Sequence, residues 1–457
     1  MSERTETEAE SGAGDGAAAA ARRREQHGWY FYDFACSVYS TSVLTVFLGP
    51  YLTAIAKAAA DAEGYVHPLG IPVRAGSFFA YSVSVSVIVA VLIMPLAGAA
   101  ADRTGRKKPL LAVAAYTGAA ATAGMFFLDG DRYLLGGLLL IVANASLAVS
   151  MVLYNAYLPQ ISTPDERDTV SSRGWAFGYT SGALVLVLNL VLFQGHESFG
   201  LSEGTAVRIC LASAGLWWGA FTLVPLRRLR DRAVVRGEAG GAPAVSGWRQ
   251  LIATLKDMRR YPLTLSFLLA YLIYNDGVQT VISQASIYGS EELELEQSTL
   301  IVAVLLVQVL AVVGALTMGR LARSYGAKRT ILGSLAAWTL TLGAGYFLPA
   351  RTPMWFFALA AMIGLVLGGS QALSRSLFSH LVPAGKEAEY FSAYEMSDRG
   401  LSWVGPLVFG LTYQLTGSYR DAIISLVVFF ALGFVLLARV PVRRAVEAAG
   451  NPVPERV

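Results

Sequence analysis

Long apolar stretches alternate with short polar segments along almost the whole chain. Most of the stretches have about 20 residues or more, the length that a helix needs to cross a bilayer. A helix also satisfies its own backbone hydrogen bonds, which lipid cannot do. The pattern predicts an all-α membrane protein with twelve transmembrane helices, at residues 29–56, 77–101, 109–128, 133–157, 171–194, 205–226, 261–288, 298–319, 328–348, 353–382, 388–416 and 419–439.

The polar segments differ in charge from one side of the predicted membrane to the other. If both termini are cytoplasmic, the inner segments contain about 30 of the 36 basic residues, most densely over residues 227–260. Cytoplasmic loops are enriched in Lys and Arg, so this arrangement and an even number of spans are expected. Within the central segment, apolar residues recur at helical spacing, at Trp248, Leu251, Ile252, Leu255 and Met258. They predict an amphipathic helix that lies either on the inner leaflet or on the cytoplasmic ends of the spans.

Two stretches half a chain apart resemble each other. Residues 98–111 align without gaps to residues 319–332, and residues 171–174 align to 397–400. The two offsets, 221 and 226 residues, are nearly equal. The repeat predicts two six-helix bundles, 28–226 and 261–439, with a disordered tail at 1–27, a basic linker at 227–260 and a C-terminal cytoplasmic tail at 440–457. Duplicated halves of this kind are typical of transporters that rock about a central site.

The repeated segments supply the residues expected in gates and loop turns. Glycines let helix ends approach closely, and the basic residues anchor the loop at the membrane face. A plain positive-inside loop explains an isolated copy equally well. The predicted gate and loop residues are Gly98, Asp102, Arg103, Gly105, Arg106, Arg173, Glu395, Asp398 and Arg399.

Composition excludes several other classes of protein. The chain is 54% hydrophobic and 15% charged, whereas soluble domains are about 25% charged. A net charge of +4 does not indicate nucleic-acid binding. Cys36 and Cys210 give neither a disulfide framework nor metal-ligand spacing, and the phosphate-loop and zinc-protease motifs are missing. We therefore expect no enzyme activity, cofactor or metal.

Ionisable residues inside predicted spans are costly and become candidates for function. Asp276 lies near the middle of its span, with Gln279 one turn away, and Asp33 lies in the inner third of the first span. Each carboxylate is expected to take a proton or a substrate ammonium. The alternatives are that Asp276 bonds to a neighbouring helix and that Asp33 pairs with Arg173.

Arg375 is a buried positive charge, with Gln371 one turn away. Its guanidinium is expected either to hold a substrate carboxylate by two parallel hydrogen bonds or to pair with Glu395 or Asp398 in the next span. Asn155, flanked by Tyr154 and Tyr157, is the most promising ligand among the amides within the spans, although such amides often only join helices.

The chain also resembles a known family along nearly its whole length. The loop at 98–108 resembles that between helices two and three of the major facilitator superfamily. Residues 32–39, 171–179, 274–280, 368–376 and 402–407 are similar to the family typified by the fungal vacuolar amino-acid effluxer linked to autophagy. Phe34 and Cys36 stand where that family usually has Trp and Asn. The resemblance implies transport of amino acids or similar metabolites by a monomer.

Together these observations predict a secondary active transporter for a small polar metabolite, perhaps an amino acid, that works by alternating access and is coupled to an ion or a proton. A receptor or lipid-handling protein built on a transporter fold is the alternative. Buried charges of both signs favour transport. The richness in Ala, Gly and Arg suggests a bacterial source and hence the cell membrane.

Overall fold

The computed structural model is almost entirely helical. It describes residues 2–75, 78–232, 256–295, 297–387, 390–391, 393–394, 404–405, 408–409, 412, 416 and 418–456. The N-terminal helix group comprises α1 (Ser2–Val38), the π-helix η1 (Tyr39–Phe47), α2 (Leu48–Ala58), α3 (Phe78–Thr104), α4 (Lys107–Gly124), η4 (Met125–Phe127), α5 (Tyr133–Asn155), α6 (Leu158–Ile161), η5 (Pro164–Glu166), α7 (Arg167–Gln194) and α8 (Glu203–Arg228). The C-terminal helix group comprises α10 (Pro262–Ile287), η6 (Tyr288–Glu292), α11 (Gln297–Tyr325), α12 (Ala327–Tyr346), α13 (Pro353–His380), α16 (Tyr419–Ser425), α17 (Val427–Arg439) and α18 (Val442–Ala448).

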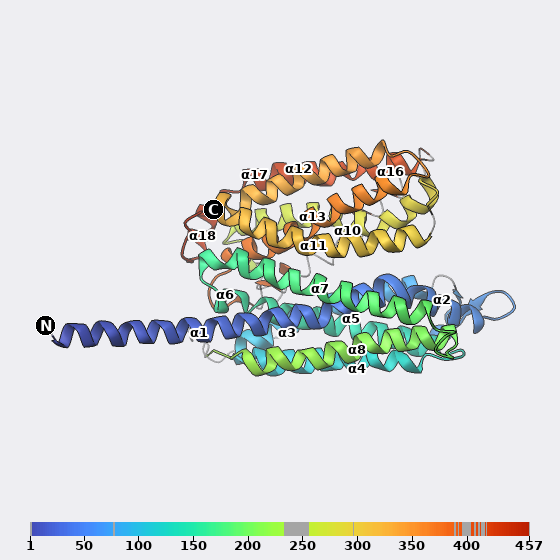
Figure 1. The fold of residues 1–457 in the computed structure, drawn as a ribbon, viewed down its shortest axis with the longest axis horizontal. Helices are drawn as coiled ribbons and strands as arrows, with labels where there is room; N and C mark the ends of the chain where they lie inside the picture. Colours follow the sequence, from blue (N-terminus) through green and yellow to red (C-terminus); the bar gives the residue numbers. More distant parts are fainter. Residues whose placement is uncertain are drawn as a thin grey trace.

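The two helix groups lie side by side, with nearly parallel helix axes (Figure 1). Each has its own hydrophobic core: one is drawn from residues 29–229, the other from residues 258–446 together with Tyr179. Helix α7 joins the groups by packing along α11 and α13. Polar residues at this junction are therefore placed between two separately packed bodies.

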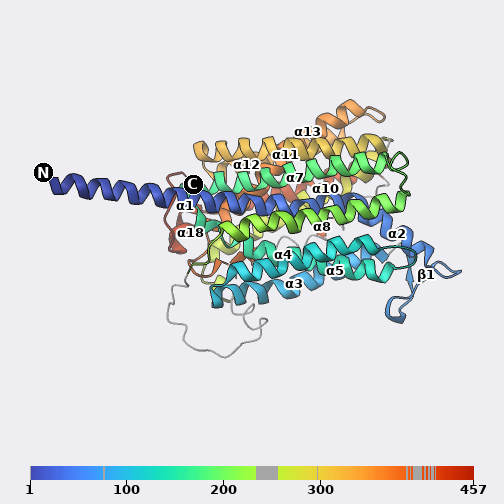
Figure 2. The same ribbon diagram turned by 60° about the horizontal axis from the view of Figure 1, so that its bottom comes forward.

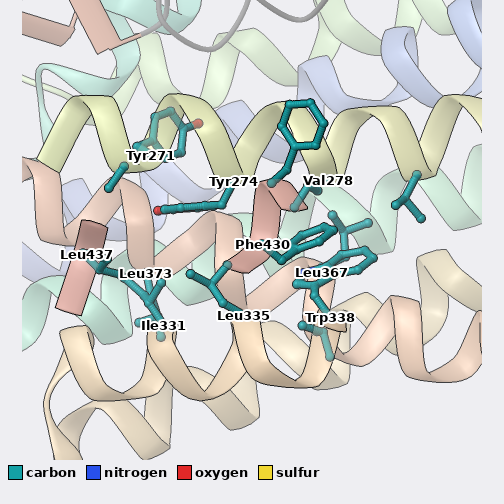
Figure 3. Packing of buried hydrophobic residues seen from close by; sticks show 14 of the residues in the cluster. Tyr271, Tyr274, Val278, Ile331, Leu335, Trp338, Leu367, Leu373, Phe430 and Leu437 are labelled. Carbon is teal, nitrogen blue, oxygen red and sulfur yellow. The ribbon is translucent and has the colours of Figure 1, made fainter. Parts of the chain in front are cut away.

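The core of the C-terminal group shows how the sequence pattern becomes packing. Ile331, Leu335 and Trp338 lie on one face of α12, at the i, i+4 and i+7 spacing that marks a buried helical stripe. The Trp338 ring stacks on Phe430 of α17, with centroids 5.3 Å apart and planes inclined by 10° (Figure 3). Side chains from four helices, α10, α12, α13 and α17, meet around this stack.

The described residues test only some of the twelve predicted spans. Among the described residues, eight helices are long and apolar enough to cross a membrane, or nine if the bent pair 19–47 and 51–58 is one span. Helix α3 has a shorter apolar portion, Val85–Ala101. Most of the span predicted at 388–416 lies outside the described residues. The fold is thus a multi-span helical membrane fold, and the count of twelve remains a prediction.

The sequence repeat corresponds to a repeated helix turn. Gly105 between α3 and α4 has φ +64°, and Gly326 between α11 and α12 has φ +88°. Glycine adopts positive φ without the steric cost of a Cβ. The matched lysines also behave alike: Lys107 Nζ lies 3.5 Å from the Ala156 carbonyl oxygen, and Lys328 Nζ donates to that of Ala438 at 2.9 Å. A cation at the C-terminal carbonyls of a helix satisfies exposed acceptors and opposes the negative end of the dipole.

The two ends of the molecule differ. One end, called here the terminal end, carries α18 and the short helix α6 (Figures 1 and 2). The other, the hairpin end, carries two short antiparallel strands, β1 (Tyr65–Val66) and β2 (Val73–Arg74), in which Tyr65 pairs with Arg74. This end also has exposed ion pairs such as Arg351 with Glu294.

The N-terminal segment differs from the prediction of a disordered tail. Helix α1 begins at Ser2 and continues without a break into the core, where Trp29 is fully buried. The segment contains five consecutive alanines at 17–21, followed by Arg and Glu residues, all of which favour helix. The linker residues predicted to form an amphipathic helix lie outside the described residues, apart from 256–260.

Candidate functional site

A cavity of about 430 Å³ lies between the two helix groups. It is lined from the N-terminal group by α1, η1, α5 and α7, and from the C-terminal group by α10, η6, α11, α12, α13 and α16. Five of the six residues predicted to bind substrate or proton are in its lining: Asp33, Asn155, Gln279, Gln371 and Arg375. Residues from both halves of the sequence therefore meet at one site.

The innermost part of the cavity holds a buried ion pair. Arg375 of α13 is 2% exposed and Asp33 of α1 is 4% exposed. Arginine Nη1 lies 3.3 Å from Asp33 Oδ2, and Nη2 lies 3.4 Å from the same oxygen. Tyr154 donates to this oxygen at 2.6 Å. Charges removed from water need partners of this kind, because an unpaired buried charge is strongly destabilising.

The remaining N–H groups of Arg375 also bond to the N-terminal helix group. Its Nε donates to Ser171 Oγ at 3.0 Å, Nη2 to the Ser171 carbonyl at 3.0 Å, and Nη1 to Asn155 Oδ1 at 3.4 Å. The guanidinium carbon lies 4.7 Å from the centroid of the Trp29 ring and 5.3 Å from that of Trp175. A side chain of one helix group is thus held in a polar and aromatic cage built by the other.

These contacts give Asp33 a different partner from Arg173, the one that the sequence suggested as an alternative to a proton or substrate. Its carboxylate pairs with Arg375, whereas Arg173 is exposed and lies near the Tyr30 hydroxyl instead. The sequence places Asp33 and Arg173 at similar depths but does not give the direction in which each helix turns its side chains. The predicted partners Glu395 and Asp398, and the predicted gate residue Arg399, lie outside the described residues.

Asp276 matches the alternative suggested for it, a hydrogen bond to a neighbouring helix, and it does not lie beside Gln279 in the cavity. It is 3% exposed but is absent from the cavity lining, and its Oδ2 accepts a hydrogen bond of 2.8 Å from the Gly405 N–H. The neighbouring Gly277 packs against Phe429 of α17. Instead, Asn275 and Gln279, one turn apart on α10, face α13 and the cavity: Asn275 Oδ1 accepts from Gln371 at 2.7 Å. Asp276 therefore does not share a face with Gln279 as predicted.

The two walls of the cavity have different chemistry. The N-terminal wall supplies Asp33 and a series of hydroxyls: Ser37, Ser40, Thr41 and Thr45. The C-terminal wall supplies most of the aliphatic side chains: Val281, Ile282, Leu300, Ala303, Val307, Leu359, Ile363 and Leu367. Such a site suits a molecule with a charged part and an apolar part.

The cavity extends toward the hairpin end and is closed toward the terminal end. Its lining includes Tyr288, Leu300 and Phe356, which lie where η6, α11 and α13 approach the hairpin end. Between the Asp33–Arg375 pair and the terminal end, further contacts join the two helix groups. Among them, Ser171 Oγ donates to the Ala372 carbonyl at 2.7 Å.

Closer to the terminal end, three further contacts join the groups. Arg167 Nη1 donates to the Ser379 carbonyl at 3.1 Å and lies 3.2 Å from His380 Nδ1. Arginine can only donate, so this histidine nitrogen accepts and the ring proton is on Nε2. Lys107 pairs with Glu387 at 3.5 Å, with both side chains largely buried. These contacts join the two helix groups between the cavity and the terminal end.

Sequence reasoning missed Arg167 and Glu387, and took Lys107 only as a loop anchor. The other predicted loop residues lie near the α3–α4 turn: Gly98, Asp102 and Arg103 are in the last turns of α3, and Arg106 is exposed before α4. Gate residues look like ordinary positive-inside loop residues in a sequence. Only their position opposite a partner from the other helix group distinguishes them.

Comparisons with known proteins agree with this architecture. The family described as "Vacuole effluxer Atg22 like" matches residues 21–450. The chain is 29% identical over 420 residues to the uncharacterized MFS-type transporter YxiO of Bacillus subtilis, covering 91% of this chain and 95% of that protein. It is 26% identical over 523 residues to autophagy-related protein 22 of Pyricularia oryzae, covering 92% and 76%.

A crystal structure shows the fold more directly. The Escherichia coli fucose:proton symporter FucP superposes with a TM-score of 0.67 at 13% sequence identity, covering 91% of this chain and 97% of that one. At this identity the likeness shows the fold alone. The chain is a membrane transporter rather than an enzyme, and it belongs to the vacuole effluxer Atg22-like family of the major facilitator superfamily.

Proposed function

We propose that this transporter moves a small zwitterionic metabolite with an apolar body, such as an aliphatic amino acid, by alternating access. The observation that carries the proposal is the Asp33–Arg375 pair at the inner end of the cavity. Its two charges belong to different helix groups, so a substrate bound between them interacts with both moving bodies at once.

A zwitterion suits this pair for an energetic reason. Separating Asp33 from Arg375 would leave two buried charges unpaired, which is strongly unfavourable. A substrate ammonium on Asp33 and a substrate carboxylate on Arg375 replace the lost partner of each. Arginine binds a carboxylate by two parallel hydrogen bonds. The substrate thereby lowers the barrier to withdrawing Arg375 from its cage.

The rest of the cavity supports an apolar substrate body. The aliphatic wall of the C-terminal group includes Val307, Leu359 and Ile363. An apolar part of the substrate that packs against this wall is removed from water, which stabilises the complex by about 25 cal/mol per Å² of apolar surface buried. The hydroxyls of Ser37 and Thr41 and the amides of Asn155 and Gln279 provide polar contacts. The volume of about 430 Å³ lies within the usual range for small-molecule sites.

We infer that the terminal end faces the cytoplasm of a bacterial cell and the hairpin end faces outward. The distribution of Lys and Arg supports this orientation. Twelve spans in two bundles, 28–226 and 261–439, a linker at 227–260 and a monomeric state complete the proposal. The structure then corresponds to a state open outward and closed at the gate formed by Lys107, Glu387, Arg167 and His380.

Coupling to a proton at Asp33 is proposed for an anionic substrate only. A zwitterion neutralises both members of the ion pair, whereas an anionic substrate would occupy Arg375 and leave Asp33 to take a proton. Asp276, which lies outside the cavity lining, remains a second candidate for the proton only. The effect of a pH gradient on each substrate class separates these possibilities.

The test is counterflow of labelled amino acids into proteoliposomes preloaded with unlabelled amino acids, with and without a pH gradient. Asp33→Asn and Arg375→Lys should each abolish counterflow of aliphatic amino acids. Asp131→Asn removes an exposed carboxylate in a loop and should leave it unchanged. Wild-type binding without counterflow would favour a receptor-like role, and counterflow that survives both site variants would remove these residues from the site.

A further inference from the structure

A second cavity lies at the terminal end, apart from the central site. It is lined by the end of α11, the starts of α12 and α18, and the C-terminal tail. From its chemistry we propose that it binds the phosphate of an anionic phospholipid headgroup. The inference does not depend on which substrate is transported.

The lining of this cavity is strongly basic. Five of its residues are cationic and one is acidic: Lys328, Arg329, Arg443, Arg444, Arg456 and Glu455. The cavity has a volume of about 780 Å³. An anion that enters this cavity is therefore attracted by positive charge from several parts of the lining. The planar guanidinium of arginine can donate two parallel hydrogen bonds to the oxygens of a phosphate.

Some of these cations have structural partners, and others are exposed. Lys328 Nζ donates to the carbonyls of Ala438 and Val440, at 2.9 and 2.7 Å, where α17 ends. Arg456 Nη1 donates to the Ser324 carbonyl at 2.7 Å. These bonds fix the walls of the cavity. Arg329 and Arg444 are exposed side chains of the lining and are the groups best placed to bind an anion.

The position of the cavity favours a lipid over a soluble phosphate. It lies where α17 ends, and the same helix exposes apolar side chains nearer its middle, with Val428 56%, Leu432 49% and Val435 44% exposed. Tyr325, in the lining itself, is 61% exposed. Aromatic residues gather at the headgroup level of membranes, and basic pockets beside spanning helices bind anionic headgroups. A lipid could place its chains along α17 and its phosphate in the cavity.

The occupant would also touch the C-terminal tail. Residues 453–456 form one wall of the cavity, and the Glu455 N–H donates to Asp165 Oδ1 of the other helix group at 3.1 Å. A bound headgroup would therefore stabilise a segment that crosses from one helix group to the other at the closed gate.

The experiment uses the full-length protein in neutral detergent, titrated with phosphatidylglycerol or phosphatidylcholine in mixed micelles. Thermal unfolding and native mass spectrometry report binding. Phosphatidylglycerol should bind more tightly, and R329Q/R444Q should weaken it by about thirtyfold, because each cation near the membrane surface contributes about fivefold. R23Q/R259Q removes two exposed cations outside the cavity and should change the affinity less than twofold.

Several results would overturn the proposal. The two lipids could bind equally well, or the affinity for phosphatidylglycerol could fall equally in R329Q/R444Q and R23Q/R259Q. Inorganic phosphate could also stabilise the protein as much as phosphatidylglycerol does, which would mean that the cavity binds a soluble phosphate. If R329Q/R444Q does not fold, R329K/R444K serves in its place. This variant should keep a preference for phosphatidylglycerol while losing the bidentate arginine contacts, and loss of that preference with the fold intact would count against the site.

Discussion

Nη1 of Arg375 lies 3.3 Å from Oδ2 of Asp33, although 342 positions of sequence separate the two residues and they belong to different helix groups. Each is buried, and every hydrogen bond described above for the arginine side chain goes to the N-terminal helix group. The pair is therefore both the floor of the cavity and a bond between the two bodies. Any motion that opens the terminal end has to break it.

Removing one member of this pair should be worse than removing both. Asp33→Asn leaves the guanidinium buried without its counter-charge, which should lower the free energy of unfolding by about 3–5 kcal/mol. D33N/R375Q removes both charges and should recover part of that loss, while counterflow stays absent. Thermal unfolding in detergent, combined as a double-mutant cycle, measures the coupling. Additive effects of the two substitutions would mean that the pair contributes no interaction energy.

A close contact between α11 and α7 offers a way to force the gate open. A Cβ added at Gly319 would lie 2.5 Å from Ser172 Oγ and 2.7 Å from Ser172 Cβ. Both distances are far below van der Waals contact, and these atoms belong to different helix groups. Gly319→Ala should therefore shift the population severalfold toward a state open at the terminal end. Gly333→Ala is the matched control, because no atom outside its own helix turn lies within 4 Å of a Cβ there.

The readout is the labelling rate of a reporter cysteine at the gate. Ser379→Cys, in a background without Cys36 and Cys210, places a thiol at a position that is 1% exposed in this state. A maleimide that does not cross membranes should label it faster in Gly319→Ala than in Gly333→Ala. Equal rates in the two variants would show that this contact does not hold the gate closed.

The sequence predicts the parts of this site better than their arrangement. Asp33 and Arg375 could be found because a charge inside a span is costly, and the turn glycines Gly105 and Gly326 because they align in a repeat. The sequence does not show that Asp33 pairs with Arg375, because several charged residues are predicted at a similar depth in the membrane. The direction of Asp276 was also inaccessible, because the rotation of α10 is fixed by packing of its neighbour Gly277 against α17.

A second buried pair gives a test of the gate that does not involve substrate contacts. Lys107 and Glu387 lie 3.5 Å apart, with side chains 7% and 11% exposed. Glu387→Gln removes the carboxylate that faces the buried Lys107 ammonium and should speed labelling of the Ser379→Cys reporter. The charge-reversed variant K107E/E387K restores opposite charges and should slow labelling again. If the reversed variant labels as fast as Glu387→Gln, the attraction between these charges does not hold the gate.

Outside the spans, Asp257 should make stability depend on pH. Burial tends to raise the pKa of Asp257, but hydrogen bonds and charge from Lys386, at 2.6 Å, and a bond from Tyr390, at 3.1 Å, hold it below its ordinary value. A carboxylate with a depressed pKa stabilises the fold above its unfolded pKa, and this contribution is lost as pH falls through the folded value.

Asp257→Asn should therefore be less stable than the wild type at neutral pH and converge with it below roughly pH 4. Thermal unfolding across this range measures the difference, which should be small because the pair is partly exposed to water and therefore screened. Asp131→Asn, in an exposed loop, should parallel the wild type throughout. A difference that persists unchanged in acid would assign the effect to something other than the charge.

The C-terminal tail should also hold the gate closed, through one backbone bond. The donor is the backbone N–H of Glu455 and the acceptor is Asp165 Oδ1. The Glu455 side chain takes no part in this bond. Glu455→Pro removes the N–H, and Glu455→Ala keeps it. The proline variant should label the Ser379→Cys reporter up to about fivefold faster, the equilibrium effect of a ~1 kcal/mol hydrogen bond, and the alanine variant should not. Asp165→Ala removes the acceptor and should behave like the proline variant.

Two results would contradict this prediction. Faster labelling in Glu455→Ala as well would assign the effect to the lost Glu455 carboxylate, and an unchanged rate in all three variants would show that the tail does not restrain the gate.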